Sequence, residues 1–363
     1  MTHRQMIRIR RLGFAVLLFW AVLAVTALTH AQPVTLLTHD SFSLPDEAIE
    51  RFEDDTGLEL RVLSGGDAGE MVNRALLTRA RPIADALFGI DDALIAREGA
   101  RDLFTPYRAE GILAVRDELR FAGDLLTPVT VGYVNFNLDP AALEERGLPL
   151  PEDLTDLVQG PYHGATVVPD PATSSPGLAF LLTTVARFGE GGSYDWLDYW
   201  ADLRDADVQV TSGWSDAYYT AFTRYGGDRP IVLSYATSPA AEAIFADEPP
   251  EAPLTLNLTC EACAWRQIEA AGILAGSGRP EDAERVIDFL ISEEVQEAVP
   301  TSMFVYPVRE DVALPDAYDR FATMPSEAQT ADLPAERIER EQERWLDQWT
   351  EVVRRGRSPE QVR

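Results

Sequence analysis

Residues 165–188 read ATVVPDPATSSPGLAFLLTTVARF, and this stretch decides how the chain is expected to fold. Its first part, 165–168, is a short apolar run of the kind that forms a buried strand. Its last part, 178–188, has the apolar spacing and the length of a helix. Between them Ser175 is a good helix N-cap, and Pro176 suits the first helical position. The stretch therefore predicts a strand that turns directly into a helix, which is the repeating unit of α/β proteins.

The same alternation of strand and helix continues on both sides of this stretch. It predicts an α/β fold with mainly parallel sheets, in which ligands bind at the carboxyl ends of the strands. The expected strands are 33–38, 59–63, 84–90, 208–210, 231–235 and 265–274, and the expected helices are 44–55, 70–81, 216–225, 280–291 and 335–355.

The chain length favours two lobes, because 363 residues exceed the usual size of one domain. Residues 127–137 form a long extended stretch that suits a crossover from one lobe to the other. We expect a first α/β lobe of residues 32–126 plus 265–299. The second lobe would contain residues 127–264 plus 300–363 and would end in a charged amphipathic helix.

The first thirty-one residues have the pattern of a secretory signal. Four arginines precede the apolar run 12–28, and small residues precede the expected cleavage point after Ala31. An uncleaved anchor is the alternative. The signal predicts a periplasmic or other extracytoplasmic protein, and no cysteine follows the apolar run to support a lipid anchor.

The charge balance excludes several classes of function. Sixty acidic residues outnumber 31 basic ones, and the formal charge is −29. Such a chain is a poor partner for nucleic acid, whose phosphates need basic surfaces. All of the basic residues are arginine, so lysine Schiff-base chemistry and a P-loop lysine are excluded as well.

Two cysteines, Cys260 and Cys263, are separated by two residues. In an exported chain this spacing favours a disulfide, with a redox-active pair as the alternative. A zinc site would need further ligands, and the mature chain offers only His39 and His163, which are far apart in sequence. We expect no metal and no cofactor.

Three junctions between a strand and a helix carry hydroxyl or aromatic side chains, at 170–178, 211–219 and 233–240. Free N–H groups at a helix start attract anions, so the first junction predicts either an anion site or plain capping. Trp214, in the second junction, either packs between lobes or lines a ligand cleft. Tyr235, in the third, is either an ordinary strand-end residue or a ligand contact.

In the first lobe, Asp40 and Asp67 follow the ends of the first two expected strands. Aspartates are common in turns, and that is the simpler interpretation. If both face the junctions of the second lobe, the cleft combines carboxylates, aromatic rings and anion donors. That combination suits a zwitterion or a cation that carries a phosphate.

Motifs for catalysis are missing from the sequence. It contains no Gly-x-Ser-x-Gly elbow and no His-Glu-x-x-His. We therefore expect a binding protein and not an enzyme. An exported hydrolase that uses Ser174 or Ser175 is the alternative, and it would turn over phosphate esters.

At these residues the chain resembles the periplasmic thiamine-binding proteins of ABC importers, from Val34 to about Arg354. The pieces that carry the resemblance are Asp40-Ser41-Phe42, Gly89-Ile90-Asp91, the junction from Asp170 to Leu178, Gly213-Trp214-Ser215, Ser234-Tyr235-Ala236-Thr237-Ser238-Pro239, Pro300-Thr301 and Tyr306-Pro307-Val308.

The resemblance implies a two-lobed type II solute-binding fold that closes on thiamine, thiamine monophosphate or thiamine pyrophosphate. It also implies a monomer that delivers its cargo to an ABC permease in the membrane. By the same resemblance, Ser174 and its neighbour Ser175 would lie near the phosphate or hydroxyethyl end of the ligand. Trp214 and Tyr235 would share that pocket, and Asp67 would contribute from the first lobe.

Three positions depart from the pattern of that family. His39 replaces a tyrosine, Phe304 replaces a tryptophan, and Ala241 replaces a tyrosine that would stack on the ligand. Either another side chain compensates or the ligand differs; ferric iron, a phosphonate or a polyamine are the alternative cargoes. The adjacent pair Tyr218-Tyr219 suits iron less well because it lies within an expected helix. We expect the ligand to be bound by Asp67, Ser174, Ser175, Trp214, Tyr235, His39, Asp40 and Phe304.

Overall fold

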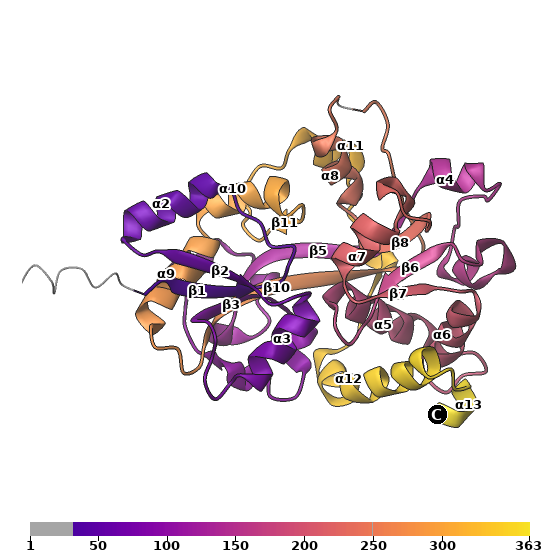
Figure 1. Ribbon diagram of the computed structural model, residues 1–363, viewed down its shortest axis with the longest axis horizontal. Coiled ribbons are helices and arrows are strands. Elements are labelled where there is room, and N and C mark those ends of the chain that lie inside the picture. The colour runs from indigo at the N-terminus through magenta and orange to yellow at the C-terminus, as the bar shows by residue number, and fades with distance from the viewer. Residues whose placement is uncertain (1–31, 249) are drawn as a thin grey trace, which may run out of the picture. The chain divides into compact units, whose positions relative to one another are not determined.

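Figure 1 shows the computed structural model of the protein, which describes residues 32–248 and 250–363. The secretory signal predicted at residues 1–31 lies outside the described residues. In the described part, every helix is too short or too polar to span a lipid bilayer.

The described strands form one mixed sheet, in the order β2-β1-β3-β10-β5-β8-β6-β7. At one end β2, β1 and β3 are parallel, and at the other end β8, β6 and β7 are parallel, as the alternating sequence predicts. These strands are β1 (Val34–Thr38), β2 (Leu60–Ser64), β3 (Ala86–Asp91), β6 (Thr166–Pro169), β7 (Gln209–Thr211) and β8 (Ile231–Tyr235).

Two long strands join the parallel ends, namely β5 (Thr127–Leu138) and β10 (Ala264–Leu274). They pair with each other, and with the strands on either side, in the antiparallel sense. Figure 1 shows both strands running between the two ends of the sheet. Four two-residue strands extend the sheet beside them: β4 (Phe104–Thr105), β9 (Leu256–Asn257), β11 (Tyr306–Pro307) and β12 (Thr330–Ala331).

Helices cover the sheet at both of its ends. The β2-β1-β3 end carries α2 (Asp46–Thr56), α3 (Ala68–Leu77), α9 (Pro280–Leu290) and α10 (Glu293–Ser302). The other described helices are α4 (Pro140–Glu145), α5 (Ser175–Phe188), α6 (Trp196–Asp205), α7 (Trp214–Asp216), α8 (Ser238–Phe245), α11 (Asp316–Phe321), α12 (Ala335–Trp349) and α13 (Pro359–Val362).

One expected helix is irregular. In place of a regular helix over 216–225, α7 runs into a π-helical turn at Ala217–Ala221 and then into a 3-10 turn at Thr223–Tyr225. The Phe222 N–H bonds to the carbonyl oxygen of Ala217, five residues earlier, which widens the helix.

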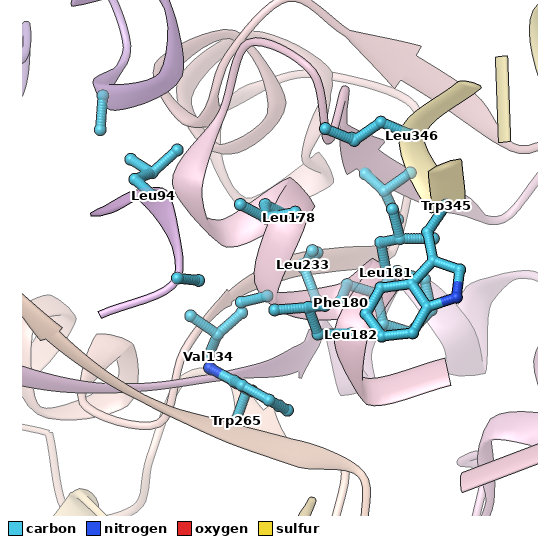
Figure 2. Packing of buried hydrophobic residues seen from close by; sticks show 14 of the residues in the cluster. Leu94, Val134, Leu178, Phe180, Leu181, Leu182, Leu233, Trp265, Trp345 and Leu346 are labelled. Atoms are coloured by element: carbon cyan, nitrogen blue, oxygen red, sulfur yellow. The ribbon is translucent and has the colours of Figure 1, made fainter. Parts of the chain in front are cut away.

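The largest core cluster is packed around α5. Leu178, Phe180, Leu181 and Leu182 project from this helix, and Figure 2 shows them between the sheet and Trp345 of α12. Residues that are apolar on all sides of a helix indicate complete burial. Nearly all of α5 is buried, so the helix start is held in a fixed position beside the site.

The disulfide that the sequence favours is not present, and this prediction is wrong. Both Cys260 and Cys263 are free thiols. The turn between them holds the Cys263 sulfur against the backbone of Cys260, 2.8 Å from its nitrogen and 2.9 Å from its carbonyl oxygen. The Cys263 sulfur therefore contacts both this peptide unit and the neighbouring Cys260 thiol, and no disulfide joins the two.

The lobe boundaries stay a prediction. Residues Val34–Arg363 form one compact unit, and the core cluster around α5 includes Leu37 and Met71 from the β2-β1-β3 end. The long strands β5 and β10 pass from one end of the sheet to the other.

Candidate functional site

The carboxyl ends of the parallel strands lead into a cavity of about 340 Å³. Pockets for small molecules have volumes of about 300–1,000 Å³. His39 and Asp40 reach it from the end of β1, Tyr235 from the end of β8, and Trp214 from the start of α7. This is where ligands bind in open α/β sheets.

His39 is held from both sides of its ring. Its Nδ1 lies 2.9 Å from the Ser41 hydroxyl, and its Nε2 lies 3.5 Å from a carboxylate oxygen of Glu269. Glu269 in turn accepts a 2.6 Å hydrogen bond from the Thr130 hydroxyl. Gly89 makes room for the ring, because a Cβ at this position would come within 2.3 Å of it. The imidazole is therefore fixed at the cavity wall.

Trp214 is fixed by a chain of polar contacts. Its indole N–H donates to the Ser234 hydroxyl over 2.8 Å, and that hydroxyl lies 3.0 Å from the hydroxyl of Ser238. The indole also stacks on Tyr218, with ring centroids 5.1 Å apart. The serines of the third junction thus orient an aromatic face toward the cavity.

Tyr235 packs against a glycine of the long strand β5. A Cβ on Gly132 would come within 2.9 Å of the Tyr235 ring. The Tyr235 hydroxyl donates to Gln267 over 3.3 Å, and burial raises its pKa, so the phenol stays neutral. Tyr235 therefore contributes its aromatic ring to the cavity wall, and its hydroxyl is held in one position by Gln267.

More tyrosines complete the same wall. The Tyr218 hydroxyl donates to buried Glu242 over 2.7 Å, and burial raises the pKa of this carboxyl group. Tyr219 and Tyr225 also line the cavity, with ring centroids 5.1 Å apart. Aromatic faces dominate this side of the site.

Asp67 lies beside the cavity and is not one of its lining residues. Its carboxylate caps α3 through the Ala68 N–H at 2.6 Å and also accepts from Ser175 N–H at 3.2 Å and Trp214 N–H at 2.8 Å. Burial raises the pKa of Asp67, whereas the hydrogen bonds from Trp214 and Ser175 oppose that rise. The carboxylate joins three helix starts and holds the backbone of Trp214.

Ser174 and Ser175 also lie outside the cavity lining. The helix N-cap is Ser174, so the prediction of Ser175 is wrong by one residue. The physical reason is that the Ser175 hydroxyl donates to Asp91 at the end of β3 and so does not cap the helix. The buried Ser174 hydroxyl faces the Asp67 carboxylate and lowers the pKa of that group.

The structure therefore separates the expected site residues into two groups. His39, Asp40, Trp214, Tyr235 and Phe304 line the cavity together. Asp67, Ser174 and Ser175 form a polar layer next to it, and Trp214 belongs to both groups through its ring and its backbone.

Several lining residues were missed from sequence, among them Glu269, Tyr219, Tyr225 and Phe245. A signal existed for Glu269, because an acidic residue in the middle of a strand that is expected to be buried is costly without a purpose. The sequence pointed to Tyr219 only as part of a possible iron site with Tyr218, and Tyr225 gave no signal.

The carboxylates along the cavity wall carry negative charge. Asp40 and Glu269 are the acidic side chains, and no arginine is among the described lining residues. Within the described residues, no three His, Cys, Asp or Glu side chains gather as a metal site would require. The cavity is suited to an organic cation with flat rings.

A family model for bacterial extracellular solute-binding proteins matches residues 82–329. The chain belongs to this family. The membership confirms the predicted location outside the cytoplasm, and it agrees with a binding role.

The relatives of this solute-binding protein are similar over nearly all of its length. The thiamine-binding periplasmic protein of Salmonella typhimurium is 30% identical over 92% of this chain and 98% of its own. A solved periplasmic thiamin binding protein has a TM-score of 0.77 and 28% identity, covering 90% of this chain and 98% of its own.

The iron-bound HitA of Pseudomonas aeruginosa shares the fold alone, with a TM-score of 0.68 and 18% identity over 88% of this chain and 99% of its own. These likenesses confirm the predicted type II periplasmic-binding fold of this solute-binding protein.

Proposed function

We propose that this protein is a receptor that captures thiamine between the two ends of its sheet and delivers it to an ABC permease. The observation that carries the proposal is the cavity itself, which combines aromatic rings with the carboxylates of Asp40 and Glu269. A thiazolium cation is attracted both by ring faces and by fixed negative charge in a partly dry site. The thiamine-binding relatives noted above support the same cargo.

Phosphate esters of thiamine are included in the proposal. The N–H groups of Ser175 and Trp214, at the starts of α5 and α7, already bind Asp67, so the donors offered to a phosphate on the cavity wall are the hydroxyls of Ser41, Ser43 and Ser215. We expect the monophosphate and pyrophosphate to bind, and we expect a monomer.

The proposed role is binding without catalysis. The Ser175 hydroxyl donates to the carboxylate of Asp91, and the imidazole of His39 is held by Ser41 and Glu269. Neither arrangement pairs Ser174 or Ser175 with a histidine base, which a serine hydrolase needs. Iron is disfavoured as cargo because the Tyr218 hydroxyl is already engaged by Glu242.

Native mass spectrometry of freshly isolated protein tests the proposal most directly. We expect a one-to-one complex of a monomer with thiamine or one of its phosphate esters. Calorimetric titration of unfolded and refolded, ligand-free protein should then show saturable binding of thiamine and none of ferric citrate. Release of phosphate from either ester, or the absence of thiamine binding, contradicts the proposal.

A further inference from the structure

One face of α8 is turned toward the cavity. Ser238, Ala241 and Phe245 all line it, and their spacing of three and four residues places them on one side of a helix. Ala240 and Ala243, on another side of the helix, are buried in the core, so the helix cannot rotate freely. The side chains of this face are therefore presented to whatever enters the cavity.

Phe245 is the outermost of these residues. It ends α8 and keeps 69% of its surface exposed, which is unusual for a phenylalanine in a well-packed fold. Its ring centroid lies 4.7 Å from that of Phe304, at an angle of 48°. Two aromatic rings thus meet at the solvent side of the cavity, from segments about sixty residues apart.

The backbone of Phe304 is held in a strained conformation. Its backbone has φ of 56°, a left-handed conformation that glycine adopts far more readily than phenylalanine. Its N–H bonds to the carbonyl oxygen of Val299 over 3.0 Å, so the end of α10 fixes this conformation. Strain retained at a cavity wall points to a role for the side chain that bears it.

Ala241 leaves open space one helical turn before Phe245. Both residues lie on the cavity side of α8, and the small side chain leaves the wall without bulk there. A flat ring can lie over Ala241 and stack on Phe245 at the same time. Stacked aromatic rings attract each other beyond the effect of buried area alone.

We propose that Phe245, supported by its contact with Phe304, forms an aromatic clamp that holds a planar ring of the cargo against Ala241, with Phe245 as a specificity-determining contact. This inference rests on the proposed function, because thiamine supplies the ring. The clamp selects for flat heteroaromatic cargo and against flexible ions of similar charge. It also explains why an apolar ring is left exposed where a ligand enters.

Three substitutions at Phe245 separate a stacking role from simple bulk. Calorimetric titration with thiamine should show binding about tenfold weaker or worse for Phe245→Ala and Phe245→Leu. Phe245→Tyr should bind within about threefold of the original protein, because it keeps the ring. Leu113→Ala is the matched control, since Leu113 is 80% exposed and lies outside the cavity lining.

A fourth variant, Phe304→Gly, tests the strained ring. It should raise the melting temperature, because glycine accepts the left-handed backbone, and it should weaken thiamine binding about tenfold. Such opposite changes are not expected of a residue that only supports the fold.

Each outcome decides between the two proposals. If the original protein binds thiamine but Phe245→Leu binds it equally well, the clamp is wrong and the function stands. The clamp is equally wrong if Phe304→Gly leaves the affinity unchanged. If the original protein does not bind thiamine at all, the proposed function is wrong and the clamp is rejected with it.

Discussion

A single carboxylate, that of Asp67, joins helix starts from both ends of the sheet. It accepts N–H groups from Ala68, Ser175 and Trp214, which lie on α3, α5 and α7. Positive helix ends stabilise a negative charge, which offsets part of the cost of burying it. At the same time the contact fixes the backbone of Trp214, whose ring lines the cavity.

We therefore expect Asp67→Ala to weaken thiamine binding about tenfold or more. The free energy of unfolding should fall by about 1–3 kcal/mol, because buried N–H groups lose their acceptor. Calorimetric titration and urea unfolding measure the two effects. Asp54→Ala is the control, because Asp54 is an exposed carboxylate on α2. Unchanged affinity in the Asp67 variant contradicts its role in placing Trp214.

At the scale of elements, local sequence predicts the strands well and the contacts between them poorly. Apolar runs such as 33–38 and 231–235 become β1 and β8 with ends shifted by at most one residue. The start of α5 is displaced by one residue because Ser175 bonds to Asp91, 84 positions away. The same limit applies to the site: Asp40 and Trp214 were predicted from strand ends, whereas Glu269 and Phe245 depend on long-range packing.

The connection between β3 and the following 3-10 turn at Leu94–Ala96 predicts a pH dependence. Asp91 is 1% exposed and accepts the Ala93 N–H and the Ser175 hydroxyl. Burial raises its pKa to about 6, from 3.8. Between these values the folded protein keeps a proton that the unfolded chain loses, so stability decreases as the pH rises.

Urea unfolding at about pH 4.5, 5.5, 6.5 and 7.5 measures how the free energy of unfolding changes with pH. These pH values lie on both sides of the raised pKa of Asp91. We expect the free energy of unfolding to fall most steeply below about pH 6, because each proton released changes it by about 1.4 kcal/mol per pH unit. In Asp91→Asn, which cannot titrate, the slope should be smaller. An equal slope in both proteins shows that Asp91 does not cause it.

Across the whole molecule, α3 packs directly on the segment before α5. The Glu70 N–H donates to the Thr173 carbonyl oxygen over 2.9 Å, which joins the β2-β1-β3 end to the β8-β6-β7 end beside the cavity. We expect a ligand that touches both ends to shift the population toward the arrangement in which these two backbones are in contact. Closure therefore depends on how near the two backbones can come.

Substitutions at two glycines distinguish an effect on the contact between the two ends from an effect on folding stability. A Cβ on Gly69 of α3 would come within 2.5 Å of Thr173, across the two ends, whereas a Cβ on Gly177 would come within 2.6 Å of Pro169, inside one end. We expect Gly69→Ala to weaken thiamine binding about tenfold with little loss of stability, because alanine suits helices. Gly177→Ala should instead lower the melting temperature, since overpacking costs about 1–3 kcal/mol. Small-angle X-ray scattering of the ligand-free proteins should show a larger radius of gyration than the original protein only for the Gly69 variant. If that variant has the same thiamine affinity and the same radius of gyration as the original protein, closure does not depend on this contact.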